Sequence, residues 1–409
     1  MREWPSNLDV EGLTAGGWQP TPFRQFVVKI HSRCDLACKY CYVYEMADSS
    51  WRDRPKVMSA EILAATAARI GEHVRAHDLD AVELVLHGGE PLLAGTEPIR
   101  EIVTRVRSET APGTHLKVSL QSNATLLDLR YLRLFDELGV RVGVSLDGDE
   151  AMHDRSRRRA NGQGSHAAVM TALGLLTSPD FRHLFGGLLC TVDLRNDPVG
   201  AYEALAAFDP PAVDFLLPHG NWSAPPPGRE AGASGTPYAD WLIRVFDHWY
   251  GTPRRRTDVR LFGEIIHLLL GGSSASEQVG LSPVAMVVVE TDGGVEQSDL
   301  LKSAYQGAPE TGLHVTRDPF DAALALPAIA ARQIGALALA AECRQCPVGG
   351  VCGGGLYAHR YRAGSGFANP SVYCPDLLRL VGHVRKTVEK DLAARVGAAA
   401  ERARDEGAR

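Results

Sequence analysis

Seven of the eight cysteines in this 409-residue chain fall into two tight groups, a pattern that indicates metal binding or redox chemistry in a reducing compartment. The groups are Cys34, Cys38 and Cys41, and then Cys343, Cys346, Cys352 and Cys374. Three thiolates can ligate three irons of a four-iron cubane and leave the fourth iron open to a ligand. Four thiolates close such a cluster or bind a structural zinc. Cys190 stands alone, and we expect a buried small hydrophobe there.

A second motif, His87-Gly-Gly-Glu-Pro91, follows the first cysteine group by roughly fifty residues. Its two glycines permit close backbone approach to a ligand, and Glu90 offers acceptors for an ammonium group. Each motif alone has a plainer interpretation. The cysteine triplet fits a zinc knuckle with a fourth ligand from elsewhere, and Gly-Gly-Glu-Pro fits a turn before a helix.

The elements around these motifs alternate between β-prone and helical patterns. The predicted strands are Phe26–Ile30, Val82–Leu86, Leu116–Leu120, Val140–Leu146, Leu188–Leu194 and Val213–Leu217. The predicted helices are Ser59–His77, capped by Ser59, Pro98–Glu109, Asp128–Leu138, His166–Leu176 and Pro198–Phe208. Six strands with intervening helices predict an α/β fold with a parallel sheet, a partial (β/α)6 TIM-like barrel that lacks two strands of a full barrel.

Chemistry in such folds gathers where the parallel strands end. The first two strands end at the two motifs, and further polar residues follow the third and fourth strands. These are Gln121, Asn123, Ser145, Asp147 and, slightly later, Arg157. Capping and turn formation are the plainer interpretation of the strand-end residues.

The second half of the chain predicts a different organisation. A Pro/Gly/Ser-rich linker covers 223–235, helices cover 238–250 and 259–270, and a hairpin with an Asp-Gly turn covers 284–297. A charged helix runs from Pro375 to about Arg402. The predicted units are an N-terminal extension (1–22), the barrel (23–235), a helical linker region (236–283), a cysteine-bearing domain (284–384) and a charged C-terminal helix (385–409).

Bulk properties exclude several classes of partner. The net charge of −6 and a pI of about 6.2 argue against nucleic acid and anionic membrane as partners. No run of 18 apolar residues and no signal peptide is present, so we expect a cytoplasmic protein without a membrane span.

The cysteine triplet after the first strand, with Gly-Gly-Glu after the second, resembles the radical S-adenosylmethionine (SAM) superfamily. The resemblance implies a SAM-binding [4Fe–4S] cluster on Cys34, Cys38 and Cys41, and a place for the SAM amino group at Gly-Gly-Glu. It also implies Tyr40 near the adenine and Arg157 at the SAM carboxylate. The implied SAM-binding residues are Tyr40, Gly88, Gly89, Glu90, Pro91, Gln121, Asn123, Ser145, Asp147 and Arg157.

The second cysteine group resembles the SPASM extension of peptide-modifying radical SAM enzymes, where it holds an auxiliary [4Fe–4S] cluster. Its spacing alone fits zinc equally well. The full SPASM pattern has further cysteines where this chain has Leu356 and the pair Ser298-Asp299. We therefore expect one auxiliary cluster and two clusters in total.

Four segments resemble the FxsB-type radical SAM/SPASM maturases: 214–222, 289–297, 352–361 and 366–374. The resemblance implies a three-residue cyclophane, a bond from an aromatic ring carbon to a side-chain β-carbon in a ribosomally made precursor peptide. It also implies an electron donor such as flavodoxin or ferredoxin. His219, which follows the sixth strand, is the predicted proton acceptor, and Asp214 is the second candidate.

Two alternatives stay open. One is a radical SAM enzyme that modifies a folded protein, as sulfatase maturases do, and the other is a non-catalytic zinc or iron–sulfur sensor. About 22 residues precede the first strand, too few for a leader-binding module. We therefore expect the C-terminal region or a partner protein to present the precursor.

Overall fold

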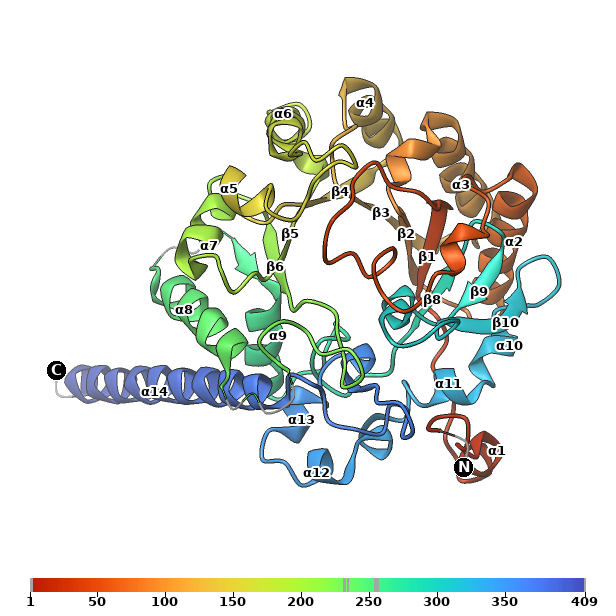
Figure 1. Cartoon of the computed structure of the whole chain (residues 1–409). Helices are drawn as coiled ribbons and strands as arrows, with labels where there is room; N and C mark the ends of the chain where they lie inside the picture. The colour runs from red at the N-terminus through yellow and green to blue at the C-terminus, as the bar shows by residue number, and fades with distance from the viewer. Residues whose placement is uncertain (1–2, 231–232, 234, 254–256, 408–409) are drawn as a thin grey trace.

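The computed structural model describes residues 3–230, 233, 235–253 and 257–407. Its six central strands form an arc with helices on the outside (Figure 1). They are β1 Gln25–His31, β2 Ala81–Gly88, β3 His115–Ser122, β4 Val140–Ser145, β5 Phe185–Thr191 and β6 Ala212–Leu216. Each pairs with the next in parallel, which confirms the predicted α/β barrel-like fold.

The sheet is longer than predicted. Within the described residues it has ten strands in the order β10-β9-β8-β1-β2-β3-β4-β5-β6-β7. β7 (Asp258–Val259) pairs in parallel with β6, and β8 (Met286–Val289) pairs in parallel with β1. The two strands that the six-strand prediction lacked are therefore present. One is only two residues long, and the other also forms the predicted hairpin with β9 (Gly294–Glu296), to which β10 (Glu310–His314) adds.

The helices that cover the sheet begin and end close to their predicted limits. They are α2 Ala60–Ala76, α3 Thr96–Glu109, α4 Leu129–Leu138, α6 His166–Leu176 and α7 Pro198–Ala206. Ser59 caps α2 as expected, because its side chain accepts a hydrogen bond from the Ile62 amide. The buried residues of α2 recur at helical spacing, which gives this helix one face against the sheet.

Alternation along the strands divides the interior into two environments. In β2, Val82, Leu84 and Leu86 are buried in the main apolar core, whereas Glu83 and His87 belong to the opposite face. The same period puts Lys29 of β1 opposite the core residues Val28 and Ile30. The core thus lies under the helices, and the polar residues of the strands share the other face of the sheet.

The C-terminal half packs back onto this barrel. Helices α8 (Pro237–Gly251) and α9 (Arg260–Leu269) match the prediction, and α14 (Cys374–Gly407) is longer than predicted and extends away from the barrel (Figure 1). The remaining helices are short: α1 Val10–Ala15, α5 Glu150–His153, α10 Asp321–Leu324, α11 Pro327–Ala330, α12 Ala341–Arg344 and α13 Gly349–Cys352. The 3-10 turns are η1 Ser50–Arg52, η2 Pro91–Ala94, η3 Arg182–Leu184, η4 Asp299–Ser303, η5 Gly335–Ala338 and η6 Tyr357–Arg360.

The predicted linker 223–235 is mostly exposed where the structure describes it, but Pro226 and Arg229 are buried; residues 231, 232 and 234 lie outside the described part. Arg229 is buried, donates to the carbonyl of Val372 and lies 3.4 Å from Asp376. None of the helices described has both the length and the apolar character needed to cross a bilayer.

Candidate functional site

The first cysteine group lies on the loop that follows β1, and this loop presses directly on the end of β2. A Cβ atom added to Gly88 would lie 2.1 Å from the His31 carbonyl oxygen. One added to Gly89 would lie 1.8 Å from the Tyr44 hydroxyl and 2.5 Å from the Arg33 carbonyl oxygen. The two glycines are therefore required by the chain's own cysteine loop, whereas the sequence suggested a ligand as the reason.

Glu90 joins the end of β2 to the end of β3. Its carboxylate is buried and accepts hydrogen bonds from the Ser122 hydroxyl at 2.8 Å, the Asn123 amide at 2.8 Å and the Leu92 amide at 3.1 Å. Burial raises its pKa to about 7. The acceptors that the sequence assigned to an ammonium group are thus engaged by protein donors, and Pro91 opens the short turn η2 that follows.

The end of β3 also reaches the cysteine loop. The Asn123 side chain donates to the Cys34 sulfur at 3.5 Å and to Asp35 at 2.8 Å. Gln121 donates to the Ser145 hydroxyl of β4 at 3.0 Å. The predicted residues from these two strands therefore lie at one edge of the sheet, and Asn123 contacts the first cysteine of the loop.

Tyr40, Asp147 and Arg157 form a buried cluster beside the same loop. The Tyr40 hydroxyl donates to Asp147, and the Arg157 Nε lies 2.9 Å from the same carboxylate oxygen. Burial raises the pKa of the Cys38 thiol to about 11, and the nearby Arg157 charge opposes that rise. The sequence assigned Arg157 to the SAM carboxylate; in the structure its partner is Asp147.

The second cysteine group converges from α12, α13 and the start of α14. Cys343 interacts electrostatically with Cys346 and Cys374, and Cys352 interacts with Cys343 and Cys374. Four thiolates brought together in this way can hold a cubane, in which each binds a different iron, or a single tetrahedral zinc.

A row of four rings joins the two cysteine groups. The ring centroids are 4.7 Å apart from Tyr42 to His219, 5.6 Å from His219 to His359 and 5.0 Å from His359 to Tyr373. Tyr42 directly follows Cys41, and Tyr373 directly precedes Cys374. His219 Nδ1 and His359 Nε2 are buried and have no hydrogen-bond partner in the described structure. Burial lowers the pKa of His219 to about 4, so its ring is neutral at pH 7.

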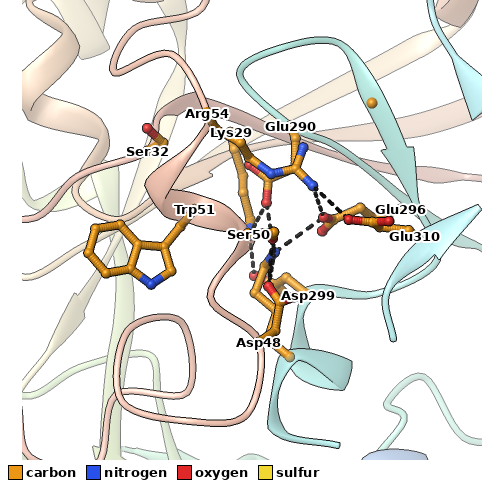
Figure 2. A network of polar contacts seen from close by, with 12 residues as sticks. Lys29, Ser32, Asp48, Ser50, Trp51, Arg54, Glu290, Glu296, Asp299 and Glu310 are labelled. Carbon is orange, nitrogen blue, oxygen red and sulfur yellow. Dashed lines mark hydrogen bonds and ion pairs between the residues drawn. The ribbon is translucent and has the colours of Figure 1, made fainter. Parts of the chain in front are cut away.

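A buried charge network that the sequence analysis missed borders this row (Figure 2). Lys29 Nζ lies 2.9 Å from Glu290 and 3.5 Å from Asp299, and Tyr42 donates to Asp299 at 2.8 Å. Burial alone would raise the pKa of Asp299, but Lys29 and its neighbours hold it below the ordinary value. A lysine inside the apolar first strand was the one signal in the sequence.

Lys302 is the second cation of the network and is fully buried. Its Nζ lies 3.2 Å from both Glu290 and Glu296 and 3.3 Å from Asp48. Arg54 also contacts Glu296, at 2.8 Å. The network therefore ties the cysteine loop after β1 to the β8–β9 hairpin.

Asp214, Cys190 and a cluster of two histidines with an aspartate lie outside this arrangement. Asp214 accepts hydrogen bonds from Gln278 at 3.1 Å and lies 3.8 Å from Arg260 of α9, and Cys190 is buried in the core as expected. His73, His77 and Asp321 are close enough to suggest a metal site. However, His73 Nε2 accepts from the Phe23 amide, so Nδ1 carries the proton that it donates to Asp321. This group is a hydrogen-bonded cluster.

Comparison with known proteins identifies the domain. Residues 28–189 match the model of the Radical SAM superfamily. A cysteine-type anaerobic sulfatase-maturating enzyme from Clostridium novyi is 25% identical over 66% of this chain and 71% of its own length. A serine-type enzyme from Klebsiella aerogenes is 25% identical over 86% of this chain and 84% of its own.

Solved structures agree on the fold. The structure of anSMEcpe with bound AdoMet has a TM-score of 0.74 at 21% identity and covers 90% of this chain and 98% of its own. SuiB from Streptococcus suis, bound to the precursor peptide SuiA, has a TM-score of 0.56 at 12% identity, over 89% of this chain and 78% of its own. Residues 28–189 are therefore assigned to the Radical SAM superfamily, and the prediction of SAM and iron–sulfur clusters as cofactors is confirmed. The finer resemblance to FxsB-type maturases stays a prediction.

Proposed function

We propose that this radical SAM enzyme forms a three-residue cyclophane in a ribosomally made precursor peptide. The observation that carries the proposal is the ring row from Tyr42 to Tyr373, which joins the two cysteine groups. When bound, SAM and the first cluster supply a 5′-deoxyadenosyl radical that removes a hydrogen atom, and the auxiliary cluster supplies an acceptor for one electron. Cys34, Cys38 and Cys41 would hold the first cluster and the four later cysteines the second.

The crosslink removes two hydrogens from the peptide, one as an atom from the β-carbon and one from the aromatic ring as a proton and an electron. The chain must therefore offer a proton acceptor beside the first cysteine group. His219 fits because it contacts Tyr42, is neutral at pH 7 and has an unpartnered buried nitrogen. A weak base suffices, since loss of the ring proton restores aromaticity. Asp299, through its hydrogen bond with Tyr42, orients the ring that packs on His219.

A second candidate function is modification of a sulfatase, because several relatives are named sulfatase-maturating enzymes. The arrangement of cysteines favours the first candidate. Ser298 and Leu356 stand where the full two-cluster pattern has cysteines, which leaves this chain one auxiliary group. A peptide substrate fits both candidates, since two similar solved structures have a bound peptide.

The test is co-expression with candidate precursor peptides encoded beside the gene, followed by mass spectrometry. We expect loss of two hydrogens per crosslink and no fragmentation between the linked residues. The His219→Gln variant should keep SAM cleavage and lose crosslinking by about 10²-fold or more. An unchanged mass for every aromatic-containing candidate, together with oxidation of a sulfatase peptide, would favour the second function. Absence of 5′-deoxyadenosine would favour the non-catalytic sensor.

A further inference from the structure

Arg360 is a buried cation that has no carboxylate partner among the described residues. Three other arginines in the described structure are equally buried, and each pairs with an acidic side chain: Arg54 with Glu296, Arg229 with Asp376 and Arg332 with Glu277. Arg360 instead donates to backbone carbonyls, at 2.6 Å to Gly353 and at 2.6 and 3.2 Å to Gly355. Burial lowers its pKa because these carbonyls do not replace a negative charge.

The backbone after the third cysteine is wound around this cation. Cys352 is followed by Gly353, Gly354 and Gly355, whose φ angles are +61°, +79° and +68°. L-residues with side chains rarely adopt three such angles in a row. A Cβ atom on Gly354 would lie 3.0 Å from the Arg360 Cζ. The glycines thus bring the carbonyls and the cysteine loop onto the guanidinium.

The positive charge of Arg360 lies beside the third cysteine of this group, because its guanidinium donates to the carbonyl of Gly353, which directly follows Cys352. The other charges near the four cysteines are Glu342 and Arg229, and Arg229 is neutralised by Asp376. Arg332 also lies near Arg360 but is paired with Glu277 at 2.6 Å. Arg360 is therefore the cation whose missing counter-charge a four-thiolate cluster would supply.

We propose that Arg360 is a positioning residue that raises the reduction potential of the auxiliary cluster held by Cys343, Cys346, Cys352 and Cys374. Reduction adds one negative charge to the cluster, and a nearby buried cation stabilises that charge. The carbonyl contacts with Gly353 and Gly355 fix the cation in place. The inference concerns the second cysteine group alone, and it holds whichever reaction the first group serves.

The test is a redox titration of the auxiliary cluster, followed by electron paramagnetic resonance. The full chain is reconstituted anaerobically, with Cys34, Cys38 and Cys41 changed to Ala so that only the auxiliary cluster contributes. We expect Arg360→Met to disfavour reduction at least tenfold, about 59 mV for a one-electron couple. Arg360→Lys should keep most of the potential. Arg332→Met is the matched control and should shift it less, because Arg332 is already paired.

Glu277→Gln gives a test in the opposite direction if Arg360→Met does not retain its cluster. It releases Arg332 from its carboxylate and should raise the potential. The proposal is overturned by an unchanged potential in Arg360→Met, or by equal shifts in Arg360→Met and Arg332→Met. A protein that holds zinc at these four cysteines also overturns it. None of these readouts depends on crosslinking, so a failed crosslink assay leaves the result interpretable.

Discussion

Each of the two cysteine groups has a buried arginine and closely packed glycines beside it, but these residues are arranged differently in the two places. Beside the first group, Arg157 is neutralised by Asp147, so the loop gains no net charge from this pair. Beside the second group, Arg360 donates to carbonyls and has no acidic partner among the described residues, so its charge is not neutralised by the protein. The glycines of the two regions also have different roles. Gly88 and Gly89 allow the cysteine loop to pack closely against the end of β2, whereas Gly353 to Gly355 allow the backbone to turn around the Arg360 guanidinium. This difference agrees with our proposals that the first group binds a ligand and that the second holds a cluster whose negative charge Arg360 stabilises.

The largest effects are expected when one cysteine is removed from each group. Cys34→Ala should reduce SAM cleavage to background, because the open iron needs all three thiolates. Cys346→Ala should leave SAM cleavage and prevent formation of the crosslinked product. Assays of 5′-deoxyadenosine and of peptide mass, with iron content as a control, separate the two. Equal loss of SAM cleavage in both variants would contradict the division of roles.

The network around Lys29 extends the comparison to stability, since its buried charges are paired. Lys29→Met leaves Glu290 and Asp299 without their nearest cation and should cost about 3–5 kcal/mol in the free energy of unfolding. Arg24→Ala is the control, because its pair with Asp80 is solvent-exposed and should contribute under about 1 kcal/mol. Denaturant unfolding measures both. Similar losses of unfolding free energy in the two variants would mean that the buried ion pairs stabilise the fold no more than the exposed pair does.

The glycine contacts at the first group predict a smaller effect. Gly89→Ala should destabilise the protein by about 1–3 kcal/mol, because the methyl group meets Tyr44 and the Arg33 backbone. It should also lower cluster occupancy. Gly174→Ala, in an exposed part of α6 with open space around it, should stabilise by about 0.5–1 kcal/mol. If Gly89→Ala unfolds at the same denaturant concentration as the unmodified protein and binds as much iron, the close packing at Gly89 does not require glycine.

The last expected effect is a pH dependence beside the first group, which is confined to pH values below about 6.5 and is therefore the smallest of these effects at neutral pH. Burial lowers the pKa of His153, which is hydrogen-bonded to the Asp147 amide, from 6.5 to about 4. Between these pH values the unfolded chain binds a proton that the folded chain does not, so stability falls as the pH falls. The contribution is at most about 1.4 kcal/mol per pH unit. His153→Gln should flatten this part of the profile, and a slope equal to that of the unmodified chain would contradict the assignment.

Local patterns predicted most of the fold, and long-range pairing explains what they missed. Six strands, five helices and the Ser59 cap were readable because each depends on neighbouring residues. β5 begins at Phe185, three residues before its predicted start, because the strand includes Gly186 and Gly187, residues that weaken a strand signal. The roles of Lys29 and Arg360 were not readable. Lys29 is 261 residues from Glu290, and the meaning of Arg360 depends on an absent carboxylate.

The pairing of Lys29 with Glu290 has a consequence for synthesis on the ribosome. The 261 residues between them take about 10–50 s to translate at 5–20 residues per second. During that time β1 lacks β8, its neighbour on one side, and Lys29 lacks its counter-ions. The nascent N-terminal half must therefore keep this lysine hydrated, and the sheet is complete on the β1 side only after the hairpin has emerged.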